Sequence, residues 1–538
     1  MTGWQQHLPV LPILLPLVAG ALLLFFSEPH HRRRGVIALA FTLAQLATAI
    51  VLLGMADGRL AAPWPDGIGV YALGNWAAPF GIVLVVDRLS AIMLTLTATL
   101  GLATLTYSLA RWERGGSHYL PLFQFLLMGL NGAFLTGDLF NLFVFFEVLL
   151  AASYGLVLHG SGAARVKAGL HYIAVNLVAS LLFLIAAALI YGATGTLNLA
   201  ELAQSAARLD AGDRVLLEIA AVLLGVVFLT KAGAWPLNFW LPAAYGAAPA
   251  PVAGVFAILT KVGVYAVLRL ATLLEDGGAP APFGGDWLFY CGLATIAAGT
   301  LGILAAQRLE RLAGYLVLVS SGTLLAAFGF AGTALTGPAL YYLVSSVLGS
   351  GAFFLVVEMA ERNRNPAADL LAVSFEAFGL QDRHDSDHPG ELAGVAIPAA
   401  MAFLGLAFVS CALLLTGLPP LSGFVGKFTL LAAAIGTPLP APALQLWLFV
   451  AALLLSGLAG VISLSRLGMR VFWETRRPAP RLQWIEAAPV AALVLLCFAL
   501  AIWAGPAMQV FDAAAQSLHQ ASAYIHAVLP AADTGASR

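Results

Sequence analysis

Long apolar stretches, separated by short polar connections, run through almost the whole chain. Each stretch of about 20 residues can cross the roughly 30 Å core of a bilayer as a helix. The predicted spans are 9–27, 35–55, 82–110, 119–137, 139–159, 168–193, 215–236, 250–272, 285–306, 310–331, 336–358, 395–418 with a continuation to about 436, 444–468 and 485–506. The runs are unbroken and do not alternate between apolar and polar residues, which excludes the strands of a membrane barrel. The expected fold is an all-α polytopic membrane protein with about fourteen transmembrane helices.

Two of these spans contain helix-breaking residues. Gly233 and Pro236 should interrupt the seventh span, and Pro419 and Pro420 with Gly423 should interrupt the twelfth. In transporters, interrupted helices at matching places in two halves of the chain indicate inverted repeats and a path at the membrane midplane. We therefore expect the functional path to pass near helices 7 and 12.

The composition agrees with a membrane protein and excludes several other classes. Hydrophobic residues make up 61% of the chain and charged residues only 10%, whereas a soluble protein carries roughly 25% charged residues. A net charge of −1 predicts no nucleic-acid partner. The cysteines Cys291, Cys411 and Cys497 lie inside apolar spans and form no CxxC motif, so neither a disulfide framework nor a metal or cofactor is expected.

The basic residues predict how the spans are oriented. Most of the 26 Lys and Arg residues lie in or beside the odd-numbered connections. The positive-inside rule then places those connections in the cytoplasm and both termini outside. The first basic cluster, Arg32 to Arg34, follows the first apolar run, so that run is expected to be a retained helix and not a cleaved signal.

Charged residues inside the spans are the strongest functional signal. Only four lysines occur in the chain, and Lys231, Lys261 and Lys427 all fall within apolar spans, as does Glu147. A charge at bilayer depth costs roughly 2.5–3.5 kcal/mol on insertion scales and marks a functional site by default. The alternative is that these charges form structural ion pairs. Three lysines for one glutamate leave unpaired positive charge, which favours a proton relay, because a buried lysine can release its proton and an arginine cannot.

Several other residues allow two interpretations each. Asp138 begins the fifth span and is either an interfacial helix cap or an ion access point. His171 in the sixth span is either a packing residue or an extension of the relay. Asp87 and Arg88 open the third span and are expected to form an interfacial pair rather than to belong to the relay. His384, Asp385, Asp387 and His388 resemble metal ligands in composition but are expected to lie in a solvated loop.

Four segments resemble one family, the D subunit of Mrp/Pha-type multisubunit monovalent cation/proton antiporters. These segments are 79–90 (PFGIVLVVDRLS), 136–155 (TGDLFNLFVFFEVLLAASYG), 230–242 (TKAGAWPLNFWLP) and 418–427 (LPPLSGFVGK). The resemblance extends over roughly residues 5–506. It reaches the related antiporter-like subunits of respiratory complex I and of membrane-bound hydrogenases.

The resemblance implies a domain organisation built on two inverted five-helix repeats. These repeats would comprise helices 4–8 and helices 9–13, with helices 7 and 12 interrupted. The corresponding regions are an N-terminal three-helix segment (1–118), the first repeat (119–272), the second repeat (285–468) and a last helix with the C-terminal tail (485–538).

The resemblance also implies roles for the buried charges. Glu147 would pair with Lys231, Lys261 would be the central relay site, and Lys427 would be the relay site of the second half. Protons would move along a hydrated midplane path, coupled to Na⁺ or K⁺ movement elsewhere in a complex of different subunits. The chain is too short for the large A subunit of such a complex.

The chain departs from many relatives at one place, in the span 336–358. Many relatives carry a histidine or lysine there, whereas this chain has hydroxyl groups and glycines, among them Ser345, Ser346 and Ser350. The link from Lys261 to Lys427 would then depend on water held by Ser345 and Ser350.

The residues therefore predict a proton-translocating subunit of a Na⁺(K⁺)/H⁺ antiporter in the bacterial inner membrane, a transporter and not an enzyme. The expected partners are the other antiporter subunits, membrane lipid, protons and Na⁺ or K⁺. One alternative is a proton-pumping subunit of an NADH:quinone oxidoreductase or a membrane-bound hydrogenase. An autonomous solute transporter is disfavoured because no substrate-specific polar pocket is visible, and a purely structural role is disfavoured by the buried lysines.

Overall fold

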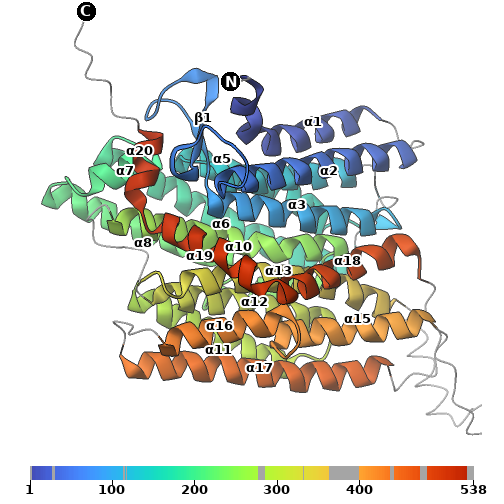
Figure 1. The fold of residues 1–538 in the computed structure, drawn as a ribbon. Helices are drawn as coiled ribbons and strands as arrows, with labels where there is room; N and C mark the ends of the chain where they lie inside the picture. Colours follow the sequence, from blue (N-terminus) through green and yellow to red (C-terminus); the bar gives the residue numbers. More distant parts are fainter. Residues whose placement is uncertain are drawn as a thin grey trace, which may run out of the picture.

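The structure is a computed structural model that describes residues 3–26, 31–112, 116, 118–160, 162–276, 285–330, 332–362, 399–436, 442–472 and 482–529. Its helices lie side by side in one bundle, with α1 and α2 at one edge and α17 at the other (Figure 1). Within these residues, thirteen helices are long and apolar enough to cross a membrane. The shorter apolar helix 119–135 occupies the predicted fourth span. The predicted polytopic helical fold is therefore confirmed.

The helices follow the predicted spans closely, and their bounds fall into an N-terminal and a C-terminal group. The first group is α1 (Leu11–Phe25), preceded by a 3₁₀ turn (Gly3–Val10), α2 (His31–Ala56), α3 (Arg88–Ser108), α4 (Tyr119–Leu135), α5 (Leu139–Val157), α6 (Ala163–Thr194), α7 (Leu199–Ala206), α8 (Ala211–Ala232), α9 (Leu241–Ala247) and α10 (Ala250–Asp276). The second group is α11 (Asp286–Ala305), α12 (Leu309–Gly329), α13 (Thr336–Glu361), α15 (Ala399–Thr416), α16 (Ser422–Gly436), α17 (Ala443–Phe472), α18 (Trp484–Ile502), α19 (Ala504–Leu518) and α20 (Ala521–Val528).

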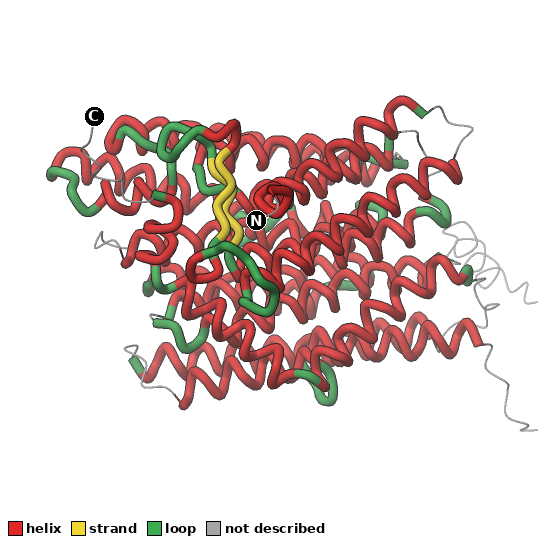
Figure 2. Tube along the Cα trace, turned by 45° about the horizontal axis from the view of Figure 1, so that its top comes forward, coloured by secondary structure: helices red, strands yellow, loops and turns green. Residues whose placement is uncertain are grey.

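A short β-hairpin lies between α2 and α3, where the apolar pattern predicts no strand. Strands β1 (Gly69–Ala72) and β2 (Val83–Val86) pair antiparallel, with Gly69 opposite Val86 (Figure 2). The prediction that a helix begins at residue 82 was wrong. The helix begins at Arg88 because the Asp87 carboxylate caps it, accepting a hydrogen bond from the Ser90 N–H at 2.8 Å.

Two helices form the centre of the bundle. The most apolar stretch of α10 is buried on every side, and α13 is almost as fully enclosed. Helix α10 packs against α3, α8, α12 and α13, while α13 also packs against α15, α16, α18 and α19. By contrast, α6 and α17 expose large apolar side chains such as Leu177 and Leu454. A helix that is apolar all round belongs inside a protein or a membrane, and α10 and α13 accordingly form the buried centre of the bundle.

Both predicted helix interruptions are present. Helix α8 ends at Ala232 and is followed by Gly233, which has a φ of +70°. Helix α15 ends at Thr416, and α16 begins at Ser422 after Gly417, which has a φ of +80°. Glycine is favoured at both positions because a Cβ strains the left-handed conformation. The sequence points to Gly423 for the second break, but Gly423 lies within α16, where a Cβ would collide with the Leu414 carbonyl oxygen.

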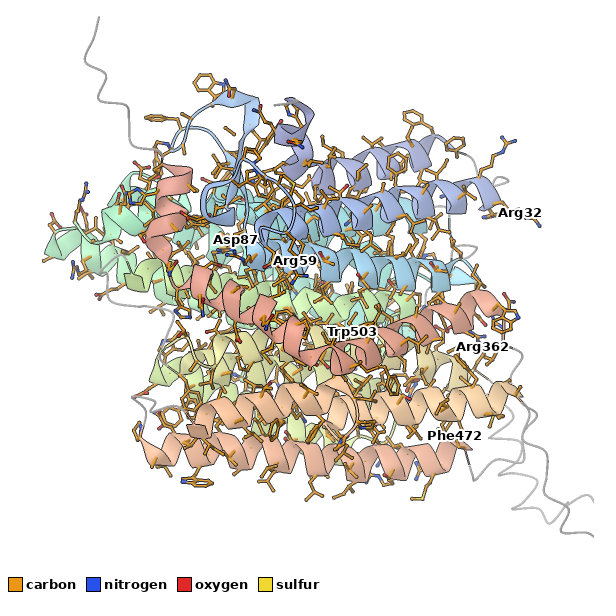
Figure 3. All side chains as sticks on the ribbon, viewed as in Figure 1. Arg32, Arg59, Asp87, Arg362, Phe472 and Trp503 are labelled. Carbon is orange, nitrogen blue, oxygen red and sulfur yellow. The ribbon has the colours of Figure 1, made fainter. Side chains whose placement is uncertain are left out.

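The C-terminal helices cross the face of the bundle. Helices α18, α19 and α20 follow one another across it (Figure 1), with Trp503 at the junction between α18 and α19 (Figure 3). Tyr341 on α13 donates a hydrogen bond to the Leu500 carbonyl at 2.9 Å, and the Thr336 hydroxyl lies 3.1 Å from His519 Nε2. Residues 507–529, within the C-terminal region predicted at 485–538, are thus largely helical and packed against the membrane helices.

A buried ion pair joins α3 to α10 near one end of the bundle. Arg269 donates hydrogen bonds to both carboxylate oxygens of Asp87, at 2.5 and 2.9 Å, and a third to the Tyr265 hydroxyl at 3.2 Å. Burial alone would raise the pKa of Asp87, but the charge and hydrogen bonds of Arg269 and the bonds from Ser90 outweigh it and hold that pKa below its usual value. The expected Asp87–Arg88 pair was wrong, since Arg88 contacts Asp57.

The two ends of the bundle differ in the charges they carry. Arg32 and Arg362 lie at one end, whereas Asp87 and Arg59 lie toward the other (Figure 3). We call the end with Arg32 and Arg362 the arginine-rich end. The positive-inside rule assigns this end to the cytoplasm. That assignment stays a prediction from the sequence.

The Asp87–Arg269 pair is predicted to stabilise the bundle strongly. Asp87→Ala would leave Arg269 buried without a counter-charge, and breaking such a pair costs about 3–5 kcal/mol. We expect a large drop in the thermal unfolding midpoint of the detergent-solubilised protein. Arg59→Ala is the matched control, because Arg59 pairs with Asp57 while 66% exposed, its loss leaves Asp57 with Arg88, and an exposed pair is worth about 1 kcal/mol or less. Equal losses in the two variants would contradict this assignment.

Gly417 is predicted to be required at the second interruption. A Cβ there would lie 2.5 Å from Lys427 Cδ, and its φ of +80° would add strain of roughly 1–2 kcal/mol. We expect Gly417→Ala to lower the unfolding midpoint. Gly405→Ala on α15, where a Cβ meets nothing within 4 Å, should leave the midpoint unchanged or raise it. An unchanged midpoint in Gly417→Ala would show that the break tolerates a side chain.

Candidate functional site

Lys261 lies at the centre of the molecule. It is on α10, its side chain is buried, and its Nζ donates a hydrogen bond to Ser321 Oγ on α12 at 3.0 Å. Neither ion pair nor cation–π contact to Lys261 occurs within the part of the chain that the structure describes. This buried ammonium group therefore has a neutral hydroxyl as its hydrogen-bond partner and no opposite charge among the described residues to balance it.

Lys231 is the next-to-last residue of α8, at the first interruption. Its Nζ lies 4.7 Å from the centroid of the Phe146 ring and has no hydrogen-bond partner among the described residues. Glu147, the next residue on α5, acts electrostatically on Lys231. Glu147 Oε1 is also buried without a hydrogen-bond partner among those residues. The structure therefore brings the two charges near each other without the direct hydrogen bond of a closed ion pair.

Lys427 lies at the second interruption. It is buried on α16, and its Nζ donates a hydrogen bond to the carbonyl of Thr416, the last residue of α15, at 2.8 Å. The final carbonyls of a helix have no partner within the helix and carry partial negative charge. The break in the helix therefore supplies the dipole that holds this ammonium group.

Serine hydroxyls connect the surroundings of Lys261 and Lys427. Ser320, next to Ser321 on α12, donates to Ser346 on α13 at 2.9 Å, and Ser345 lies 2.8 Å from Ser422 on α16. A small cavity of about 10 Å³ is bordered by Ser320, Tyr342, Ser345, Ser346, Lys427 and Ser456. This volume and these polar groups suit a single water molecule.

Only one of the two serines that the sequence predicts to hold water borders this cavity. Ser345 borders it, whereas Ser350 is buried elsewhere on α13 and does not line it. Ser320 and Ser321 were missed, and Ser346 was noted in its span without a role. Their signal was available in the sequence, since two adjacent serine pairs stand in neighbouring apolar spans.

Asp138 and His171 lie apart from the lysines. Asp138 is the N-cap of α5 and accepts a hydrogen bond from the Asn141 N–H at 2.8 Å, the cap interpretation of the two considered. Burial raises the pKa of Asp138, while the backbone hydrogen bonds from Asn141 and Phe140 act against that rise. His171 is exposed on α6, with Nδ1 2.8 Å from the Lys167 carbonyl, and lines a larger cavity at the arginine-rich end.

A network of charges at the arginine-rich end was also missed. Arg362, just after α13, donates to both carboxylate oxygens of Glu486 on α18, at 2.9 and 2.8 Å. The Trp112 indole N–H donates to both oxygens of Glu358, at 3.2 and 3.0 Å. Both glutamates stand near predicted span ends, where charge is expected, so the sequence does not distinguish them from surface residues.

Metal-ligand geometry is not found in the described part of the chain. No group of three or more His, Cys, Asp or Glu side chains there could hold a metal ion. The cluster His384 to His388 lies outside the described residues.

Comparison with known proteins shows a consistent family. Residues 136–452 match the family described as NADH:quinone oxidoreductase/Mrp antiporter, TM. The chain is 53% identical to the D subunit of a probable K⁺/H⁺ antiporter from Rhizobium meliloti, with 99% of this chain and 100% of that protein covered. It is 33% identical to the D subunit of a Na⁺/H⁺ antiporter from Alkalihalophilus pseudofirmus, with 98% and 100% covered.

Solved structures agree with this relationship. A chain of the Mrp complex from Dietzia sp. is similar with a TM-score of 0.80 and 26% identity, over 98% of this chain and 100% of that chain. A chain of respiratory complex I from Thermus thermophilus is similar in fold, with a TM-score of 0.67 and 24% identity over 93% and 98%. The protein therefore belongs to the D-subunit family of Mrp-type multisubunit monovalent cation/proton antiporters.

Proposed function

We propose that this chain is the proton-translocating subunit of a multisubunit K⁺/H⁺ or Na⁺/H⁺ antiporter. One observation carries the proposal: Lys231, Lys261 and Lys427 are all buried in the bundle, and no ion pair closes on any of them in the described residues. Two of them stand at helix interruptions and the third lies at the centre of α10.

The partners of the lysines favour a relay over a structural ion-pair network. Lys261 bonds to a hydroxyl, Lys427 to a carbonyl, and Lys231 contacts an aromatic ring with Glu147 nearby. A buried ion pair stabilises a fold only when its charges are matched and hydrogen-bonded. Neutral partners bind either the charged or the uncharged lysine, as a group that gains and loses a proton requires.

The helix contacts support an order for the proposed relay. Helix α8 with Lys231 packs on α10 with Lys261, and α10 packs on both α12 and α13. Helix α13 packs on α16, which carries Lys427. A proton would pass from Lys231 to Lys261 between adjacent helices, then through the serines of α12 and α13 to Lys427. Water in the small cavity beside Lys427 would complete the last step.

The comparisons favour antiport over a redox role. Both relatives described above are named as antiporter subunits, whereas the likeness to complex I concerns the fold. The partners would be the other subunits of the antiporter complex, and K⁺ is the first cation to test because the 53% identical relative carries that name. Placement in the bacterial inner membrane, external termini, and the two inverted repeats at 119–272 and 285–468 belong to the same proposal.

Loss of Lys261 is predicted to abolish proton exchange without unfolding the chain. Lys261→Ala removes a buried charge and strands no counter-ion, so assembly should survive. The measurement is K⁺/H⁺ and Na⁺/H⁺ exchange with a pH-sensitive dye, in everted vesicles carrying the full complex. Assembly is checked on a native gel.

Lys261→Arg separates proton transfer from charge. It keeps a positive charge at the site but cannot release a proton at working pH, so exchange should also be lost. Normal exchange in either variant, in an assembled complex, would rule out the relay and leave Lys261 a structural charge.

Ser345 and Ser346 are predicted to support the second half of the relay. Ser345→Ala with Ser346→Ala removes two hydroxyls from the cavity wall; at about 1 kcal/mol per hydrogen bond, exchange should slow roughly 5- to 30-fold. Ser350→Ala is the matched control, because that serine is on the same helix but does not line the cavity. Equal rates in the double variant and the control would remove this role.

A further inference from the structure

A wide cavity opens at the arginine-rich end of the bundle, between the ends of α6, α9, α10, α12 and α13. Its volume is about 1060 Å³, and its wall mixes charged residues with buried aromatic side chains. The inner part of that wall is formed by Trp240, Tyr245 and Phe354, all buried, with Ala253 of α10 beside them. Ala253 precedes Lys261 by two helical turns, about 12 Å along α10. The cavity therefore extends along α10 in the direction of Lys261.

Glu358 lies in the wall of this cavity and has no bidentate arginine partner, although Arg165, which also lines the cavity, acts on it electrostatically. Arg362 reaches Glu358 only at 3.5 Å, because its guanidinium is engaged by Glu486 at 2.8 and 2.9 Å. Arg111 also approaches Glu486, at 3.4 Å. The close partner of Glu358 is the neutral indole N–H of Trp112. Two arginines thus serve one of the two carboxylates, and the other is left able to accept a proton.

The two glutamates also differ in access to water. The side chain of Glu358 is 20% exposed and borders the cavity, whereas that of Glu486 is 1% exposed and does not. Phe354, one turn from Glu358 on α13, forms part of the aromatic wall against Tyr245. Behind it, the Trp240 indole N–H is buried without a hydrogen-bond partner among the described residues. A water molecule passing this wall would find a donor there.

We propose that Glu358 is the group that exchanges protons between the buried lysine relay and the water of this cavity. In the step that releases a proton from the relay into the cavity, a relay lysine becomes an amine, the Glu358 carboxylate becomes a carboxylic acid, and the proton then passes to cavity water. Trp240, Tyr245 and Phe354 are buried aromatic residues in the wall of the same cavity, and no hydrogen bond joins Glu358 to a relay lysine among the described residues, so each transfer needs water to bridge them. The role rests on the proposed proton-relay function.

Chemical rescue tests this role directly. In everted vesicles carrying the full complex, Glu358→Ala should slow cation/proton exchange about tenfold or more, and formate added to the medium should restore much of the rate. A small carboxylate can enter a cavity of this volume and carry the proton in place of the missing side chain. Wild-type vesicles in the same formate correct for dissipation of the pH gradient by the weak acid.

Glu486→Ala is the matched control. Glu486→Ala removes the other carboxylate that contacts Arg362. Because Glu486 does not line the cavity, formate should not restore any exchange activity that this variant loses. An unslowed Glu358→Ala variant, or one that is slow in an intact complex and not restored by formate, would overturn the proposal. Exchange that survives Lys261→Ala would instead refute the relay itself, so the two failures are distinguishable.

Cysteine labelling gives a second test that does not depend on transport. Ala250 lines the cavity, and Ala207 is exposed at the other end of the bundle. In a Cys291→Ser background, a membrane-impermeant thiol reagent should label Ala250→Cys in everted vesicles and Ala207→Cys only in right-side-out vesicles. Labelling of Ala250→Cys from the opposite face, or from neither face, would overturn the assignment of the cavity to the cytoplasmic side.

Discussion

The structure depends on how it holds positive charge inside an apolar bundle. An ammonium group in a low-dielectric interior needs a partner, yet a partner of full opposite charge would fix it in one state. The chain resolves this with weak partners: a serine hydroxyl for Lys261, a helix-end carbonyl for Lys427 and an aromatic face for Lys231. None of these partners carries a full negative charge, as the proposed gain and loss of a proton at each lysine requires.

The helix interruptions follow from the same constraint. An unbroken membrane helix satisfies its own carbonyls and offers none to a buried cation. Ending α15 at Thr416 frees a carbonyl for Lys427, and Gly417 makes the turn possible without a Cβ against the lysine stem. Such irregular backbone is tolerated at membrane depth because other protein segments surround it.

Stability is concentrated in well-matched ion pairs toward the ends of the bundle. Asp87 with Arg269 joins α3 to α10, and Arg362 with Glu486 joins α13 to α18. Both pairs are bidentate, the geometry in which arginine binds a carboxylate most strongly. The central helices are therefore held at their ends by closed pairs, while the charges along their middle remain open. Glu358 lies beside the closed Arg362–Glu486 pair, but its own carboxylate borders a cavity.

The sequence by itself determined the membrane class, nearly all the spans, both interruptions and the buried lysines. Each of these depends on local composition or on a run of about 20 apolar residues, which needs no partner to be recognised. Only the tertiary structure decided which groups meet. It paired Asp87 with Arg269 and not with its neighbour Arg88, and it placed Ser345 beside Lys427. Such contacts join residues far apart in the chain, and all faces of an apolar helix look alike until its neighbours are in place.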